Sequence, residues 1–339
     1  MNKKVLVTGG AGYVGLELIE NLLNKSFQVI CYDTFLYNNI STVKKFKNKN
    51  FQYIRSDIRD SKTLSKILPQ VNTVIHLAAI VGDLPCKVIP NLSYEINFLS
   101  TISLAKLCKK YGVEKFIFAS TCSNYGIINS DISAKEDSEL NPISLYAETK
   151  IDSELKLKKI ANKNMHIICL RFGTAFGISH RTRFDLLLNS LLFEAMEYKS
   201  ILVHSLDTWR PYIHVSDMAN IIHALLNKTF KDNFIIFNAG FTSLNYKKRE
   251  IVQKIKRILP NLTVKIASDQ TDFRNYRVNF SKIEKVINLK PEKDVEKGII
   301  EFIKKYKSGK INKNTYVESN LKSLQNYLKK NEKFLKFKK

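Results

Sequence analysis

The chain lacks any apolar run long enough to cross a membrane. Its 339 residues are 44% hydrophobic, which is ample for a sizeable core, yet no segment approaches the roughly 18 uninterrupted apolar residues of a membrane span. The N-terminal MNKKVLVTGG runs from two lysines directly into an apolar strand and a glycine turn, without the longer apolar run and cleavage site of a signal peptide. These features predict a compact cytoplasmic protein with no integral membrane association.

Cysteine is scarce and scattered. The five cysteines (Cys31, Cys86, Cys108, Cys122 and Cys169) are odd in number and form no C-x-x-C pair, which argues against a disulfide framework and a cysteine metal site. Three of them, Cys31, Cys108 and Cys169, lie in apolar runs and are predicted to be small core residues. We expect a reducing compartment and no bound metal.

Acidic residues are few beside basic ones, with 31 Asp and Glu against 55 Lys and Arg and a net charge of +24. Such a charge suits nucleic acid, an anionic membrane surface or a phosphorylated substrate. It is also compatible with a lysine-rich solvated surface, which we favour. No zinc finger, helix-turn-helix or interleaved aromatic-basic pattern is present, so no nucleic-acid partner is expected.

Many of the lysines gather at the C-terminus, where residues 309–339 hold nine lysines against two glutamates. Val317, Leu321, Leu324 and Leu328 follow helical spacing within this basic tail. An amphipathic helix here could dock on the body, reach a partner or touch an anionic membrane. We favour docking or a solvated tail.

Short apolar, β-branched runs alternate with amphipathic stretches through the first half of the chain. The runs predict strands at 5–8, 28–32, 51–54, 73–77, 116–119 and 166–170. The stretches predict helices at 13–24, 61–68, 94–111 and 144–159, followed later by 184–197, 215–226, 247–259 and 295–307. This order predicts an α/β fold of the Rossmann type, a doubly wound parallel sheet with helices on both faces.

A glycine-rich turn follows the first strand, in Gly9-Gly10-Ala11-Gly12-Tyr13-Val14-Gly15. Gly9 permits the tight turn, Gly12 lets a pyrophosphate approach the backbone, and Gly15 lets helix and strand pack closely. The following helix start presents unpaired N–H groups to the phosphates. The second strand leads to Asp33, whose carboxylate suits the adenosine ribose and repels a 2′-phosphate, so NAD is predicted over NADP.

The domain organisation follows from this site. We expect an NAD-binding Rossmann domain at 1–172, rejoined by about 211–240. A smaller C-terminal α/β domain, mainly 173–308, would bind the substrate, and the basic tail 309–339 would follow.

Tyr146 and Lys150 lie four residues apart at the start of a predicted helix and share one face. A lysine ammonium there would stabilise the phenolate and lower the tyrosine pKa from about 10. Such a tyrosine can take a proton from a substrate hydroxyl while hydride leaves the same carbon. The position of the pair after the fifth predicted strand supports a catalytic role. That strand ends in Ser120-Thr121-Cys122-Ser123, and its hydroxyls could hydrogen-bond the reacting oxygen.

The chain resembles the extended short-chain dehydrogenases/reductases, in particular the NAD-dependent nucleotide-sugar epimerase/dehydratase family and its C4 epimerase and C4 dehydrogenase members. The likeness covers residues 3 to about 306. Its motifs are TGGAGYVG, Asp33, DIR (57–59), HLAA (76–79), Asn97, STCSNYG, YAETK, LRFGTAFG (170–177), RTRFD (181–185), WRPYIHVSD (209–217) and FRNYRVNFSKI (273–283).

The resemblance implies a set of site residues and a homodimer. Thr121, Tyr146 and Lys150 would be catalytic. NAD would be bound by Gly9, Gly12, Tyr13, Val14, Gly15, Asp33, Asp57, Ile58, Leu77, Ala78, Ala79, Asn97, Tyr146 and Lys150. The nucleotide sugar would be bound by Thr121, Cys122, Ser123, Arg181, Arg183, Arg210 and Arg274, with arginines on its diphosphate. The dimer would form through the helices around 94–111 and 144–159.

One departure from the family pattern bears on the reaction. Family 4,6-dehydratases carry an Asp-Glu pair after the threonine, whereas this chain has Cys122 and Ser123. Neither is a carboxylic acid, so 4,6-dehydration is disfavoured, and Ser123 likewise argues against the decarboxylating members. The resemblance then implies oxidation of a ring hydroxyl, at C4, of a nucleotide hexose or heptose in polysaccharide precursor synthesis.

Three alternatives stay open. The oxidised sugar could be reduced again on its other face, making an epimerase, or released, making a dehydrogenase. A regulator that binds NAD without chemistry is the third. Cys86, in the V-G-D-L-P-C loop, is expected near the sugar as a small packing residue.

Overall fold

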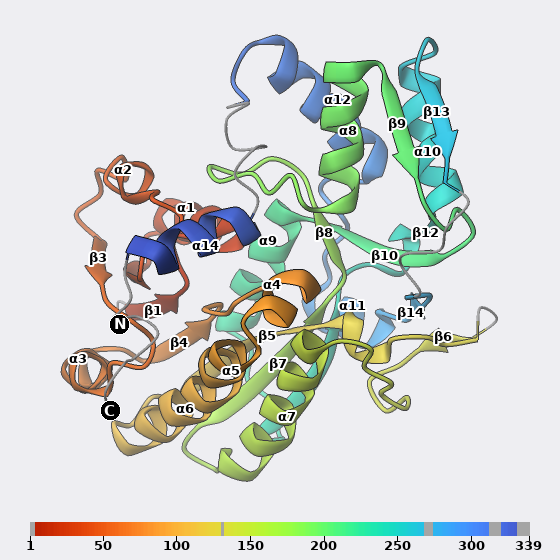
Figure 1. Cartoon of the computed structure of the whole chain (residues 1–339). Helices are drawn as coiled ribbons and strands as arrows, with labels where there is room; N and C mark the ends of the chain where they lie inside the picture. The colour runs from red at the N-terminus through yellow and green to blue at the C-terminus, as the bar shows by residue number, and fades with distance from the viewer. Residues whose placement is uncertain (1–3, 130–131, 268–273, 312–319, 331–339) are drawn as a thin grey trace.

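A computed structural model describes residues 4–129, 132–267, 274–311 and 320–330. Its centre is a seven-stranded parallel sheet in the order β11-β7-β5-β4-β1-β2-β3 (Figure 1). The strands are β1 (Lys4–Thr8), β2 (Gln28–Asp33), β3 (Phe51–Arg55), β4 (Thr73–His76), β5 (Lys115–Thr121), β7 (His166–Phe172) and β11 (Phe234–Ala239). The predicted Rossmann-type sheet is thus confirmed, and β11 is a seventh strand that the sequence reading did not include.

Side chains of alternate residues fill two cores, one on each face of the sheet. Val5 and Val7 of β1 pack in one core, while Leu6 between them packs in the other. The first core includes side chains of α1 (Tyr13–Asn24), α9 (Val215–Leu226) and α11 (Ser281–Ile287). The second includes those of α3 (Ser61–Ile67), α6 (Ser100–Lys110) and α7 (Leu145–Ile160). Covered faces explain why the strands read as continuous apolar runs.

The predicted helix at 94–111 has an irregular N-terminal half. It comprises α5 (Pro90–Tyr94), a π-helical turn η2 (Glu95–Leu99) and then α6. Within this turn the Asn97 side chain accepts a hydrogen bond from Ile80 N (2.8 Å) and donates one to Ile80 O (2.9 Å). A π-turn adds a residue to the helix, often where function needs a side chain placed, and here it ties the helix to the loop after β4.

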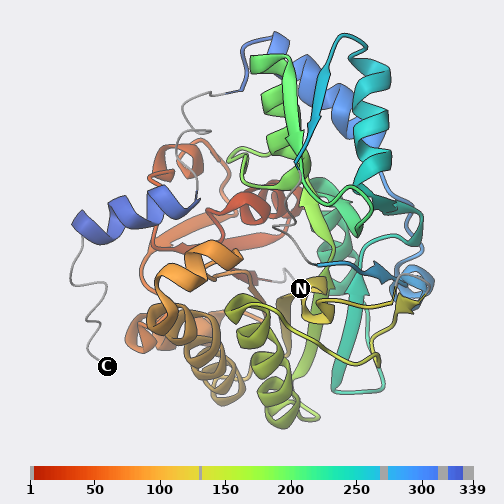
Figure 2. The ribbon, with the colours of Figure 1, turned by 45° about the vertical axis from the view of Figure 1, so that its right-hand side comes forward.

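A third core lies beyond the carboxyl edge of the sheet. It is built by α8 (Leu187–Tyr198), α10 (Lys248–Ile258) and α12 (Val295–Lys307), with β9 (Ser200–Val203) and β10 (Trp209–His214). Figure 2 shows these elements stacked above the sheet. The predicted helices at 184–197, 215–226, 247–259 and 295–307 are all present within a few residues.

Shorter elements complete the described chain. They are α2 (Ile40–Val43), α4 (Asp83–Val88), β6 (Ser133–Ala134), β8 (Thr174–Phe176), β12 (Asn245–Lys247), β13 (Thr263–Ile266) and β14 (Arg277–Val278), with the 3₁₀ turns η1 (Leu68–Gln70), η3 (Cys122–Tyr125) and η4 (Thr242–Leu244). All five cysteines are unpaired and buried.

Part of the basic tail forms the predicted amphipathic helix, α14 (Asn320–Lys330), and it docks on the body beside α4. Leu324 is buried and Leu328 partly buried in the second core. Val317, the first apolar position of the predicted pattern, lies outside the described residues.

Candidate active site

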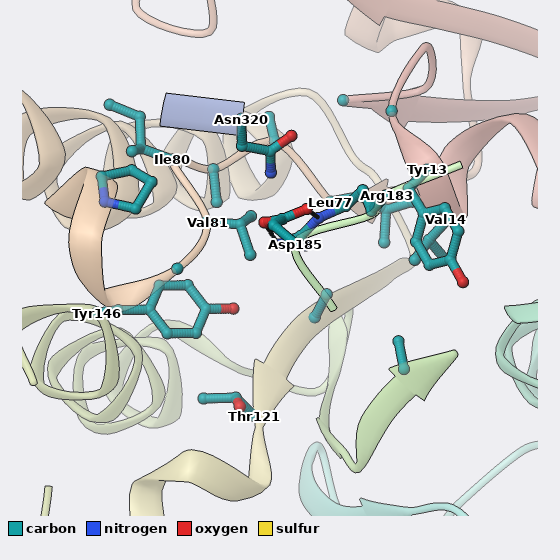
Figure 3. A pocket seen from close by; sticks show the side chains of 18 of the residues that line it. Tyr13, Val14, Leu77, Ile80, Val81, Thr121, Tyr146, Arg183, Asp185 and Asn320 are labelled. Atoms are coloured by element: carbon teal, nitrogen blue, oxygen red, sulfur yellow. Dashed lines mark hydrogen bonds and ion pairs between the residues drawn. The ribbon is translucent and has the colours of Figure 1, made fainter. Parts of the chain in front are cut away.

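A cavity of about 770 Å³ lies at the carboxyl ends of the parallel strands (Figure 3). It is the place where ligands bind to doubly wound sheets, since loops from successive strands meet there. The predicted site residues on its wall are Gly9, Gly12, Tyr13, Val14, Gly15, Asp33, Asp57, Ile58, Leu77, Ala78, Ala79, Thr121, Ser123, Tyr146, Lys150, Arg181, Arg183, Arg210 and Arg274. Nearly all of the predicted site is therefore brought together.

The glycine turn has no room for side chains. Gly9 has φ +68°, and a Cβ on it would lie 2.6 Å from Ala78 N. A Cβ on Gly15 would lie 2.5 Å from Gly10 O. Helix α1 begins directly after Gly12, so its unpaired N–H groups face the cavity as an anion site requires.

Two acidic side chains, Asp33 and Asp57, line the cavity beyond β2 and β3. Asp33, at the end of β2, accepts hydrogen bonds from Ala11 N (3.0 Å) and Phe35 N (2.8 Å), which fix its carboxylate beside the glycine turn. The Asp57 carboxylate is paired with the Arg59 guanidinium at 2.9 Å. Asp57 and Ile58 thus border the cleft through a loop that this ion pair holds rigid.

Tyr146, Lys150 and Thr121 meet at the opposite end. The Tyr146 hydroxyl points into the cavity, on the same side as Thr121 (Figure 3). Lys150 is almost fully buried, and its Nζ donates to Ala119 O (2.8 Å) and lies 5.8 Å from the Tyr146 ring centroid. Thr121 Oγ1 accepts from Ser123 N (3.1 Å), and a hydroxyl that accepts can still donate to a bound oxygen.

Burial dominates the protonation of this pair. It raises the pKa of Tyr146 above its usual value of 10.0, while the charge of Arg183 opposes the rise. Burial also lowers the pKa of Lys150 to about 8. Burial of the phenol thus acts against the lowering of the tyrosine pKa that the sequence predicts, because loss of hydration disfavours the phenolate. A cationic nicotinamide beside the phenol would act in the opposite direction.

Four arginines line the cavity, and each is held by a neighbouring acceptor. Arg183 donates two hydrogen bonds to Asp185 (3.1 and 2.7 Å). The Arg274 guanidinium lies 3.2 Å from the Asp83 carboxylate. Arg210 is buried and donates to the backbone oxygens of Trp209 and Arg274. Arg181 projects instead towards the tail helix.

Two of the predicted ligand contacts, Asn97 and Cys122, lie behind the cavity wall. Asn97 is fully buried, and its side chain bonds to the backbone of Ile80, so it holds the loop after β4 in place behind the wall. Cys122 is also buried, and its thiol donates to Arg171 O (3.0 Å), because the turn after Thr121 points it into the core. Neither lines the cavity. Cys86 is likewise buried, its thiol 3.3 Å from Ile80 O.

Several lining residues were not predicted. Asp83 follows Gly82 in the V-G-D-L-P-C loop, and Asp185 ends the R-T-R-F-D motif, so both stood within motifs that had been singled out. Tyr37 had no such signal. Three more come from α14 and are Asn320, Leu321 and Leu324.

A buried ion pair, with the hydrogen bond that its carboxylate accepts from Ser120, links the strand that carries Thr121 to the helix that carries Tyr146. Glu154 lies on α7 two turns beyond Tyr146, and its carboxylate accepts from Arg171 Nη2 (2.7 Å) and Ser120 Oγ (2.5 Å). Arg171 faces Ser120 across the β5–β7 register. This pair therefore links α7, β5 and β7 at the site.

The sheet, the glycine turn and Asp33 define a dinucleotide-binding protein of the Rossmann class. Residues 5–240 match the model of the NAD dependent epimerase/dehydratase family. The chain belongs to that family.

Relatives agree with this assignment. UDP-glucose 4-epimerase of Bacillus subtilis is 26% identical, over 75% of this chain and 81% of its own. UDP-glucuronate 4-epimerase of Thermodesulfobacterium geofontis is 27% identical, over 87% and 93%. The crystal structure of the Bacillus cereus UDP-glucuronic acid 4-epimerase with UDP-glucuronic acid and NAD is 27% identical, with a TM-score of 0.78 over 90% of this chain and 99% of that one.

The protein is an NAD-dependent enzyme of this family, and its own residues fit the cofactor. The glycine turn has no side chains that would block a pyrophosphate from its backbone N–H groups. The Asp33 carboxylate beside it would accept hydrogen bonds from the adenosine ribose. Among the described residues, no group of three or more His, Cys, Asp or Glu side chains could hold a metal ion. No helix in the described ranges is both long and apolar enough to span a bilayer.

Proposed function

We propose that this enzyme oxidises the C4 hydroxyl of a nucleotide hexose or heptose, acting as a C4 epimerase or a C4 dehydrogenase. The observation that carries the proposal is the Tyr146 hydroxyl, which points into the cleft with Lys150 and Thr121 beside it. These groups supply what hydride removal from a secondary alcohol needs: a base, a cation that tunes it and a donor to the reacting oxygen.

Each residue has one task. NAD, when bound, supplies the hydride acceptor. Tyr146 takes the proton of the sugar hydroxyl, and Thr121 holds that oxygen by a hydrogen bond as it becomes a carbonyl. Lys150 favours the phenolate by its charge and is fixed by Ala119 O. Tyr146 would thus hold the proton taken from the hydroxyl, and its return to the sugar oxygen, once the carbonyl is reduced on its other face, would give the epimer.

The positions and partners of the acidic groups in the cavity argue against dehydration across C5 and C6. Position 122 is a thiol turned into the core and position 123 is a serine. The acidic residues of the wall are already engaged, Asp33 by two backbone N–H groups, Asp57 by Arg59, Asp83 by Arg274 and Asp185 by Arg183. Elimination requires a carboxylic general acid beside the sugar, and positions 122 and 123 supply none.

Arginines on one wall support a substrate with a diphosphate. Arg183, Arg210 and Arg274 present guanidinium groups to the cavity, and guanidinium suits phosphate oxygens in bidentate contact. We assign substrate binding mainly to residues 173–308. In this proposal, residues 1–172 and 211–240 form the NAD-binding part.

The choice between epimerase and dehydrogenase turns on where the hydride goes. The two relatives and the solved structure described above are all named 4-epimerases, which supports return of the hydride to the sugar within one cycle.

Replacing Tyr146 tests the proposal directly. Tyr146→Phe removes the proton acceptor and keeps the ring, so turnover should fall by about 10²–10⁴-fold while NAD stays bound. Tyr198→Phe, at a side chain 61% exposed and remote from the cavity, is the matched control and should leave turnover unchanged. A folded Tyr146→Phe protein with near-normal turnover would overturn the proposal.

We further propose a cytoplasmic homodimer that serves polysaccharide precursor synthesis. Apolar side chains stand exposed on the helices predicted to pair, at Tyr94 (40%), Leu99 (43%) and Leu155 (59%), as an unpaired interface would show. Light scattering of the purified protein should give twice the chain mass, and Leu155→Glu should reduce it. A monomeric wild-type protein would refute the dimer.

A further inference from the structure

The tail helix α14 forms part of the cofactor cleft although it lies far beyond the matched residues 5–240. Asn320, Leu321 and Leu324 line the same cavity as the glycine turn. Leu324 is only 3% exposed and belongs to the apolar cluster that contains Ile58 and Ile80. Figures 1 and 2 both place α14 beside α4, which follows the loop after β4.

A polar connection fixes the start of α14 across the cleft. Arg181 Nη2 donates to Asn320 Oδ1 at 2.6 Å, and Asn320 is 5% exposed. The guanidinium carbon of Arg181 lies 3.4 Å from the centre of the Tyr37 ring. Tyr37 follows β2 and Arg181 follows β8, so three segments far apart in sequence are joined over one opening.

The covered end is the adenosine end. Leu324 of α14 packs in the apolar cluster that includes Ile58, which follows Asp57, and Leu36, which lies three residues after Asp33. Both carboxylates border the cleft on the side away from Tyr146. The helix therefore stands over the part of the site that holds the cofactor rather than over the reacting atoms.

We propose that α14 completes the NAD site and retains the cofactor, with Asn320, Leu321 and Leu324 as its contact residues and Arg181 as the residue that positions it. NAD can then leave only when α14 undocks, which requires Leu324 to leave its apolar cluster and the Arg181–Asn320 bond to break. This retention concerns the cofactor alone and does not depend on the sugar substrate or on the outcome at C4.

Exchange of NAD tests the proposal without any turnover. The holoenzyme is incubated with excess isotopically labelled NAD, and bound cofactor is followed by mass spectrometry after rapid filtration. Leu324→Glu places a charge in the apolar cluster and should speed exchange by about tenfold or more. Gln325→Glu makes the same substitution on the neighbouring exposed residue and should stay within about twofold of wild type.

Two further measurements keep the test decisive. Asn320→Ala removes the acceptor of Arg181 and one polar group of the cleft wall without placing a charge in the apolar cluster. It should therefore also speed exchange, even where Leu324→Glu fails to fold. By linkage, bound NAD should slow tryptic cleavage of the lysine-rich tail in the wild-type protein. Unchanged exchange in both variants would overturn the proposal. So would slower exchange or tighter binding, which would show that α14 occupies the site instead of closing it.

Discussion

Removing the charge of Glu154 should cost the protein much of its stability. The carboxylate is 3% exposed and accepts hydrogen bonds from the Arg171 guanidinium, from Ser120 Oγ and from Asn124 Nδ2. Glu154→Gln keeps the shape but leaves the equally buried Arg171 cation without its counter-charge. Breaking a buried pair from one side costs about 3–5 kcal/mol, so we expect a loss of about that size in the free energy of unfolding.

The assay is urea unfolding of Glu154→Gln against wild type, both freed of NAD so that cofactor binding does not contribute. Asp152→Asn makes the same change on an exposed position of α7 and should shift stability by no more than about 0.5 kcal/mol. The double variant Glu154→Met/Arg171→Met removes both charges and should lose less than the single variant. A loss below about 1 kcal/mol in Glu154→Gln would refute the reasoning.

Two other predictions follow from the geometry. Gly15→Ala should abolish tight NAD binding, measured by calorimetry, because its Cβ would lie 2.5 Å from Gly10 O; binding close to wild type would contradict this close packing. Burial tends to raise the pKa of Glu301, but hydrogen bonds from His214 and Lys293 lower it from 4.5 to about 2. Since the folded pKa is depressed, this carboxylate contributes stability above about pH 4.5 and loses it towards pH 2, at most about 3 kcal/mol. Acid unfolding should be less steep in Glu301→Gln, and an unchanged slope would exclude this role.

The order of strands and helices could be predicted from the sequence because each element has a pattern within its own residues. Strands buried on both faces appear as continuous apolar runs, and the helices between them show 3.6-residue spacing. The missed strand β11 has the same kind of run in Phe234–Phe237, so the signal was present. The irregular turn η2 could not be read from spacing, because it depends on the bonds between Asn97 and Ile80, seventeen residues apart.

The sequence predicted where the site residues lie better than it predicted which way their side chains point. Motifs placed Tyr146, Lys150 and Thr121 at one end of the cleft. They could not tell that Cys122 turns into the core, because the turn after Thr121 decides which way its side chain faces. The motif spacing also could not show the burial that raises the tyrosine pKa, since burial is a property of the folded environment.

The docking position of the tail helix could not be predicted from the sequence. Its spacing predicted a helix and docking was among the favoured outcomes, but no local signal says where a helix docks. That location depends on complementarity between Leu324 and a distant cluster, and on Asn320 meeting Arg181.

The most direct test of the central claim uses nucleotide sugars that carry deuterium at C4. The purified protein is incubated with UDP-, dTDP-, GDP- and CDP-linked hexoses and heptoses, and the products are examined by mass spectrometry and NMR. Our account predicts turnover of at least one of them, slowed by the deuterium and lost in Tyr146→Phe. The label should either remain on the inverted C4 or appear on the reduced cofactor beside a 4-keto product. A product lighter by one water molecule, or turnover with no isotope effect that persists in Tyr146→Phe, would contradict it.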